Sequence, residues 1–275
     1  MMKFACFYVV LMSVLINVCL AEEQQQVKHN DHKLADDPTK VITKFGISYA
    51  DNFDFDDNNV SFSGSFAFDP VRKINGRINS DGSEWRIGGS WLFPFSIINF
   101  NFGKNEYANG ATQTNYSVGT FVPLSHFDIE PAGFQIFPMA GYTYNDGEAP
   151  VCVEGRCESG DITIEATPEN GFKMVQSKGG SGYLGAFALK PLTPTWTFMT
   201  VVNFSYGSEN AQGENYQGWF GGAGLSFAPN KTHSFSVLTF VMDNNTYLDD
   251  ADKRFVLSYK YQFGQRSKSE EPSGN

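Results

Sequence analysis

The feature that most constrains the fold is a regular alternation of side-chain type, which is clearest between Val60 and Phe68. In this stretch, VSFSGSFAF, large apolar residues or glycine alternate with serine and alanine. Successive side chains of an extended chain point to opposite faces, so the stretch is predicted to be a β-strand with one apolar face and one small, polar face. The apolar face must contact either a protein core or a lipid bilayer.

The same alternation recurs along the chain, and no helical periodicity competes with it. A marginal example at residues 71–78 would direct Ile74 and Ile78 to the apolar side. In residues 182–190 the pattern assigns Tyr183, Phe187 and Leu189 to the apolar face. The segments with this pattern are residues 43–50, 60–68, 71–78, 84–93, 97–103, 115–122, 182–190, 195–207, 218–228, 233–241 and 253–263. A further strand is expected at residues 134–144, where apolar residues occupy both faces.

Two architectures are compatible with this repeat. Strands of roughly ten residues fit tilted membrane-spanning strands, whereas a secreted β-sandwich would turn the apolar faces inward. The large aromatic residues and the small, polar opposite faces favour the membrane. We therefore predict an all-β protein, an antiparallel transmembrane β-barrel with an even number of strands, twelve or alternatively ten.

The connections alternate between two kinds. Tight, proline-containing turns lie near Pro94, Pro194 and Pro229, and longer, acidic connections are expected at residues 105–112, 145–180, 207–215 and 243–252. Residues 124–132 form a somewhat longer connection on the short side. Short periplasmic turns and long outer loops are typical of outer-membrane barrels.

The two ends of the chain differ in composition from the strand region. Residues 1–21 contain Lys3, a short apolar run and a small-residue end, which predicts a cleaved signal peptide. Residues 22–40 are polar and without pattern, so we expect a disordered periplasmic linker. The barrel would occupy residues 41–263, and residues 264–275 would form a polar C-terminal tail.

With these features the chain resembles the bacterial outer-membrane β-barrel proteins of Gram-negative cells. The resemblance covers residues 41–263 and includes the closing YKYQF. It implies export to the outer membrane, contact with lipid and lipopolysaccharide, and recognition by the barrel-assembly machinery through a last strand that ends at Phe263. A polar tail after Phe263 departs from the pattern of this class.

The positions between the apolar residues carry the basic side chains of the strands. Because a charge on the lipid face costs about 2–4 kcal/mol at mid-membrane, these side chains are expected to face the lumen. This predicts a small passive channel for anionic solutes, with a closed or ligand-binding barrel, or a soluble binding protein, as the alternatives. The predicted lumen-facing residues are Lys44, Lys73, Arg77, Arg86, Lys190, Arg254 and Lys260.

Other functions find less support in the sequence. The net charge of −10 makes the chain a poor general nucleic-acid binder. Beyond the linker the histidines are His126 and His233, both expected at the periplasmic end, so we expect no catalytic site at the outer rim. The acidic stretches lack the spacing of a calcium loop, and we expect no metal or cofactor. Cys152 and Cys157 are predicted to form a disulfide in an outer loop.

Overall fold

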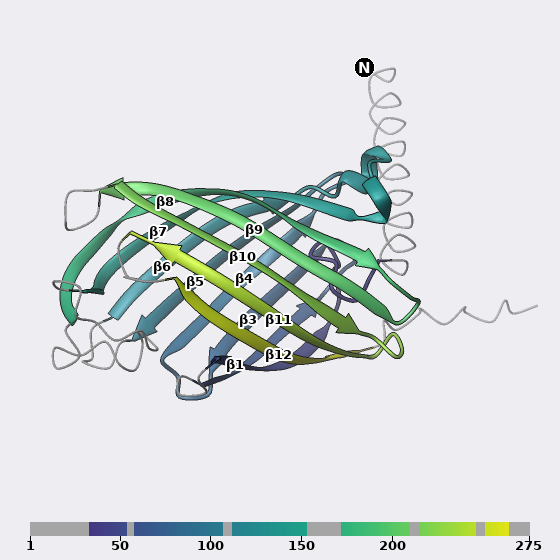
Figure 1. Cartoon of the computed structure of the whole chain (residues 1–275), viewed down its shortest axis with the longest axis horizontal. Coiled ribbons are helices and arrows are strands. Elements are labelled where there is room, and N and C mark those ends of the chain that lie inside the picture. The colour runs from purple at the N-terminus through teal and green to yellow at the C-terminus, as the bar shows by residue number, and fades with distance from the viewer. Residues whose placement is uncertain are drawn as a thin grey trace, which may run out of the picture.

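The protein forms a closed barrel of twelve antiparallel strands, each paired with its neighbours in sequence and the last paired with the first (Figure 1). The computed structural model describes residues 33–53, 58–106, 112–152, 172–209, 215–245 and 251–263. The strands are β1 Lys44–Asn52, β2 Asn59–Ala67, β3 Arg72–Asn79, β4 Glu84–Leu92, β5 Ile97–Glu106, β6 Thr112–Phe121, β7 Gln135–Cys152, β8 Phe172–Pro191, β9 Trp196–Glu209, β10 Asn215–Phe227, β11 His233–Asn244 and β12 Asp252–Gln262.

The twelve-strand prediction is confirmed, and the marginal segment at residues 71–78 is β3. The barrel closes along β1 and β12, whose register runs from Lys44 opposite Gln262 to Asn52 opposite Arg254. The N–H of Phe263 continues this ladder by donating to the carbonyl of Thr43 at 3.0 Å. Closure leaves no unpaired strand edge, which a bilayer could not hydrate.

One end of the barrel carries the tight turns. The turn between β2 and β3 is fixed by Asp69, whose Oδ1 accepts hydrogen bonds from the N–H groups of Val71 and Arg72. Asn230 stabilises the turn between β10 and β11 in the same way. The connection between β6 and β7 holds two short 3-10 helices, η1 Leu124–Phe127 and η2 Pro131–Gly133. We call this the short-turn end.

The other end, which we call the loop end, carries the longer connections. Here the structure corrects the predicted loop at residues 145–180, because β7 and β8 continue into it as a paired ladder up to Cys152 opposite Phe172. A strand needs only about 9–11 residues to cross a bilayer. The residues of β7 and β8 beyond this length therefore need no apolar face toward lipid. For this reason they lack the alternation from which spanning strands are predicted.

The outer wall exposes the large apolar side chains that the sequence assigns to it. In β2 the outward Phe66 is 55% exposed, whereas Ser61 and Ser65 are buried on the inner face. Leu184 on β8 is 68% exposed. Across the described ranges, no helix is long and apolar enough to cross a membrane. The predicted signal peptide at residues 1–21 and the tail at residues 264–275 lie outside the described residues.

Candidate functional site in the barrel lumen

The register of the strands shows which side chains share the lumen face, because residues directly opposite each other on neighbouring strands point to the same side. Four strands on one side of the ring, β12, β1, β3 and β4, carry basic residues on this face, and β2, which lies between β1 and β3, contributes small and polar residues. We call this side the basic wall, and its cations are Lys44, Lys73, Arg77, Arg86, Arg254 and Lys260.

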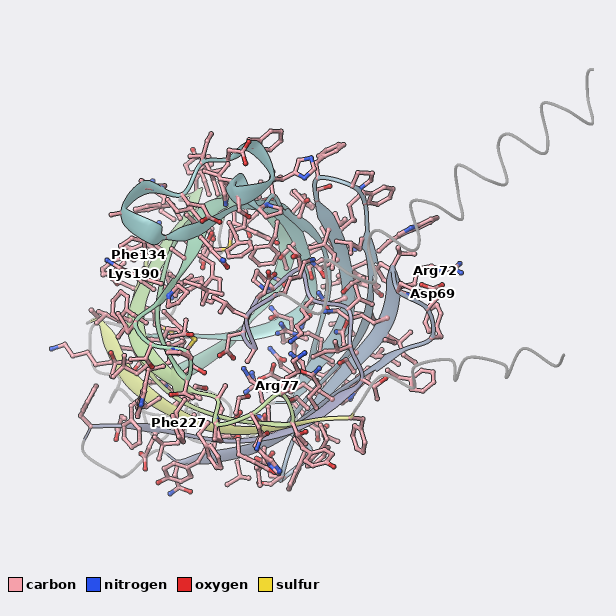
Figure 2. All side chains as sticks on the ribbon, turned by 90° about the vertical axis from the view of Figure 1, so that its right-hand side faces the viewer. Asp69, Arg72, Arg77, Phe134, Lys190 and Phe227 are labelled. Atoms are coloured by element: carbon pink, nitrogen blue, oxygen red, sulfur yellow. The ribbon has the colours of Figure 1, made fainter. Side chains whose placement is uncertain are left out.

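Two arginines stand opposite each other on the basic wall, one residue pair before the loop end of the β3–β4 ladder. Arg77 on β3 and Arg86 on β4 are paired in register, and Figure 2 shows Arg77 inside the barrel. The side chain of Arg86 remains 45% exposed although Glu84 accepts its hydrogen bond at 3.3 Å. Arg77 is exposed and has no ion-pair or hydrogen-bond partner among the described residues. Both side chains face inward and are accessible from the lumen.

The structure corrects the predicted position of Lys190. This residue is opposite Phe198 on the outer face, while the adjacent Leu189 is opposite Met199 on the inner face and completely buried. The ammonium of Lys190 lies 4.9 Å from the ring centre of Phe134, close to the short-turn end. A lysine near a membrane boundary can extend its ammonium to the interface, so the outward position does not place a charge at mid-membrane.

The same register corrects the assignment of β8. Tyr183, Phe187 and Leu189 point into the lumen rather than toward lipid, opposite Gly141, Phe137 and Gln135 of β7. They belong to an apolar wall that faces the basic wall. Its side chains are Phe121, Phe137, Met139, Tyr183, Phe187, Leu189, Met199, Val201, Phe220, Leu238, Phe240 and Met242.

Several large side chains of the apolar wall lie flat against glycines. A Cβ on Gly119 or Gly141 would collide with the hydroxyl end of Tyr183. A Cβ on Gly222 would lie 2.7 Å from the ring of Phe240. Because glycine leaves this space empty, the rings lie along the wall instead of projecting across the lumen.

Residues 33–42, which we call the lumen segment, cross the short-turn end of the barrel. Leu34 packs against the buried cluster of Phe137, Leu189 and Met199 on the apolar wall. Val41 packs against Leu92 and Ile97 on the opposite side. This corrects the prediction of a disordered linker for residues 33–40, which form turns with buried side chains.

Polar contacts hold the lumen segment to the basic wall. The ammonium of Lys260 donates to Asp36 Oδ1 at 2.7 Å, and that of Lys73 donates to the carbonyl of Lys40 at 2.6 Å. A pocket between the segment and the wall, lined by Ala35, Lys44 and other residues, has a volume of about 10 Å³, which is scarcely room for one water. The segment therefore fits closely against this wall.

Electrostatics favour the charged form of Asp36. Its side chain is 6% exposed, and this burial by itself would raise the pKa of the carboxyl. The positive charge and hydrogen bond of Lys260, with a further contribution from Lys44, outweigh burial and hold the pKa below its usual range. Within the segment, burial lowers the pKa of Lys33, whose ammonium donates to Thr39 Oγ1 at 2.8 Å.

Sequence reasoning missed both the apolar wall and the lumen segment. In residues 134–144 apolar residues occupy both faces of the expected strand. This feature of the sequence could have indicated that one side of the lumen is apolar. The segment has no comparable signal, because its many charged residues are typical of a solvated linker. Its apolar contacts come from the half-buried Leu34 and from the buried Val41 and Ile42, and apolar residues at these positions form no repeating pattern.

The remaining predicted residues do not form a site in the structure. His126 lies in η1, and His233 begins β11 on the outer face, where its Nδ1 is 2.9 Å from the hydroxyl of Tyr259. Cys152 ends β7, but Cys157 lies outside the described residues, and so does the predicted disulfide. Among the side chains that the structure describes, no group of three or more histidines, cysteines or carboxylates could hold a metal ion.

Comparisons with known proteins agree with this architecture. No protein-family model matches the sequence, and the search of curated proteins found no relative. Among solved structures, the NanC porin superposes with a TM-score of 0.51 at 8% identity, covering 80% of this chain and 100% of the porin. The KdgM porin gives a TM-score of 0.46 at 9% identity, covering 80% and 99%. The closed ring of twelve strands and the superposition on the NanC porin show that the chain has the fold of a bacterial outer-membrane β-barrel.

Proposed function

We propose that the protein is a passive channel of the bacterial outer membrane that favours small anionic solutes. The short-turn end would face the periplasm and the loop end the cell exterior, as is usual for such barrels. A continuous outer shell of large apolar side chains supports insertion into lipid and lipopolysaccharide. Phe263 is half-exposed after β12, and this exposure supports the proposal that the assembly machinery recognises the last strand there.

The observation that carries this proposal is the pair Arg77 and Arg86. Arg77 and Arg86 are in register on adjacent strands, face the lumen and remain exposed. Since arginine stays charged at any physiological pH, the pair creates a permanent positive potential in the lumen. Rings or patches of arginine and lysine of this kind favour anions in a water-filled pore.

The lumen segment favours a second candidate, a barrel that is closed at its periplasmic end. Leu34, Asp36 and Val41 anchor it to both sides of the lumen. In this state the protein would bind a solute from outside without conducting it. The two candidates differ only in whether the lumen segment moves. In the channel it leaves the lumen from time to time, and in the closed barrel it stays in place.

Planar-bilayer recording of the refolded mature protein separates these candidates. Discrete current steps support the channel, and their absence supports the closed barrel. Arg77→Gln should lower the current carried by anions relative to cations. Lys104→Gln is the matched control, because Lys104 lies on the outer face beside Glu106, and it should leave the current ratio unchanged.

A further inference from the structure

We infer that the lumen selects amphipathic organic anions, molecules that join an anionic group to an apolar body. This inference rests on the proposed channel and names the solute class of the same lumen. It follows from the arrangement of the two walls. β3 and β4 are six places from β9 and β10 in the ring of twelve strands, so Arg77 and Arg86 lie opposite the strands that carry Val201 and Phe220.

The apolar wall is unusual for a water-filled barrel. Barrel interiors are normally polar, because neither lipid contact nor a packed core requires large apolar residues there. Here Val201, Phe220, Phe240 and Met242 all point inward and are only half-buried. Apolar surface left in water is unfavourable, and an apolar solute body that covers it would gain binding energy.

The glycines beneath these side chains leave room for such a solute. Phe240 leans over Gly222, and Leu238 leans over Gly224. The ring of Phe240 and the methyl groups of Leu238 therefore lie along the wall instead of projecting across the lumen. This apolar surface on β11 lies beside β12 of the basic wall, and Val201 and Phe220 continue it on the strands opposite Arg77 and Arg86. Together they fit a molecule with two chemically different sides.

The lumen already holds a ligand of this type, which is its own N-terminal segment. Leu34 occupies the apolar wall at the Phe137 cluster, and Asp36, two residues later, gives its carboxylate to Lys260 of the basic wall. The chain thus shows that an apolar group and an anion, closely linked, satisfy both walls at once. A free solute of the same chemistry would use the same two walls nearer the loop end, at Arg77 and Phe240.

Two alkanesulfonates that differ only in chain length provide the test. Both are permanently charged, so neither crosses the lipid as a neutral acid. Single-channel block by hexanesulfonate should require at least about tenfold less compound than block by ethanesulfonate, because each buried methylene contributes about 0.8 kcal/mol. If both sulfonates blocked the wild-type protein at the same concentration, the inference about the solute class would be overturned, whereas the proposed channel function would still stand.

Variants assign the two parts of the effect to the two walls. Phe240→Ser and Val201→Ser should each reduce the dependence on chain length to about threefold or less. Arg77→Gln should weaken block by both sulfonates by a similar factor and preserve their ratio. Heat-dependent gel mobility would establish that each variant is folded. An unchanged ratio in both folded serine variants would contradict the inference, whereas a wild-type protein without any conductance would refute the proposed channel as well.

Discussion

The carboxylate of Asp36 accepts a 2.7 Å hydrogen bond from the ammonium of Lys260, although 224 positions separate the two residues in the chain. This ion pair joins the lumen segment to the last strand of the barrel. Asp36 is almost completely buried there. A buried charge that loses its partner is strongly destabilising, so the pair is expected to determine how firmly the segment occupies the lumen.

Breaking this ion pair should open the channel. Asp36→Asn and Lys260→Gln should each raise the mean current per protein, because loss of one partner of a buried, hydrogen-bonded charge pair costs about 2–5 kcal/mol. Planar-bilayer recording measures the open fraction. The exchange variant, Asp36→Lys combined with Lys260→Asp, should return the current toward the wild-type value. Unchanged currents in both single variants would show that the segment does not control conduction.

The same pair predicts a dependence on pH. The pKa of Asp36 in the docked segment is lowered, so docking gains stability above the ordinary carboxyl pKa and loses it as the pH falls toward the lowered value. The open fraction should be constant from neutral pH down to about pH 5 and rise below about pH 4. In Asp36→Asn this step should be missing. If the open fraction of Asp36→Asn still rose at low pH, another titrating group would be responsible and the prediction would be wrong.

The contact between Tyr183 and Gly141 makes a prediction about assembly. A side chain at Gly141 would meet both the ring of Tyr183 and the carbonyl of Val118. Gly141→Val should therefore destabilise the folded barrel by about 1–3 kcal/mol, seen as unfolding at a lower temperature in heat-dependent gel mobility. Gly182→Ala is the control, because a Cβ at Gly182 has only one neighbour within 4 Å, at 3.9 Å. Tyr183→Ala should partly rescue the valine variant, and a valine variant as stable as wild type would contradict this packing.

Much of the barrel could be predicted because a membrane imposes its own pattern on a strand. Between Val60 and Phe68 one face meets lipid and the other meets water, so the alternation identifies both the strand and its orientation. The alternation places Arg77 and Arg86 on the same face of adjacent strands, and the observed register pairs them directly.

The rest could not be predicted where both sides of a strand have the same polarity. In β8 the inward set contains Tyr183, Phe187 and Leu189, whereas the outward set contains Leu184 and alanines. Choosing the bulkier set as lipid-facing inverts the strand and turns Lys190 inward. The correct choice depends on the neighbouring strands and on the lumen segment, which the alternation in one strand does not encode.

The most direct test of the central claim is the reversal potential of the refolded protein in a KCl gradient across a planar bilayer. The account predicts that chloride is preferred over potassium, because solvated arginines line the lumen while Asp36 is neutralised by Lys260. Arg77→Glu should move the reversal potential toward that of potassium. A wild-type channel that prefers potassium would contradict the account.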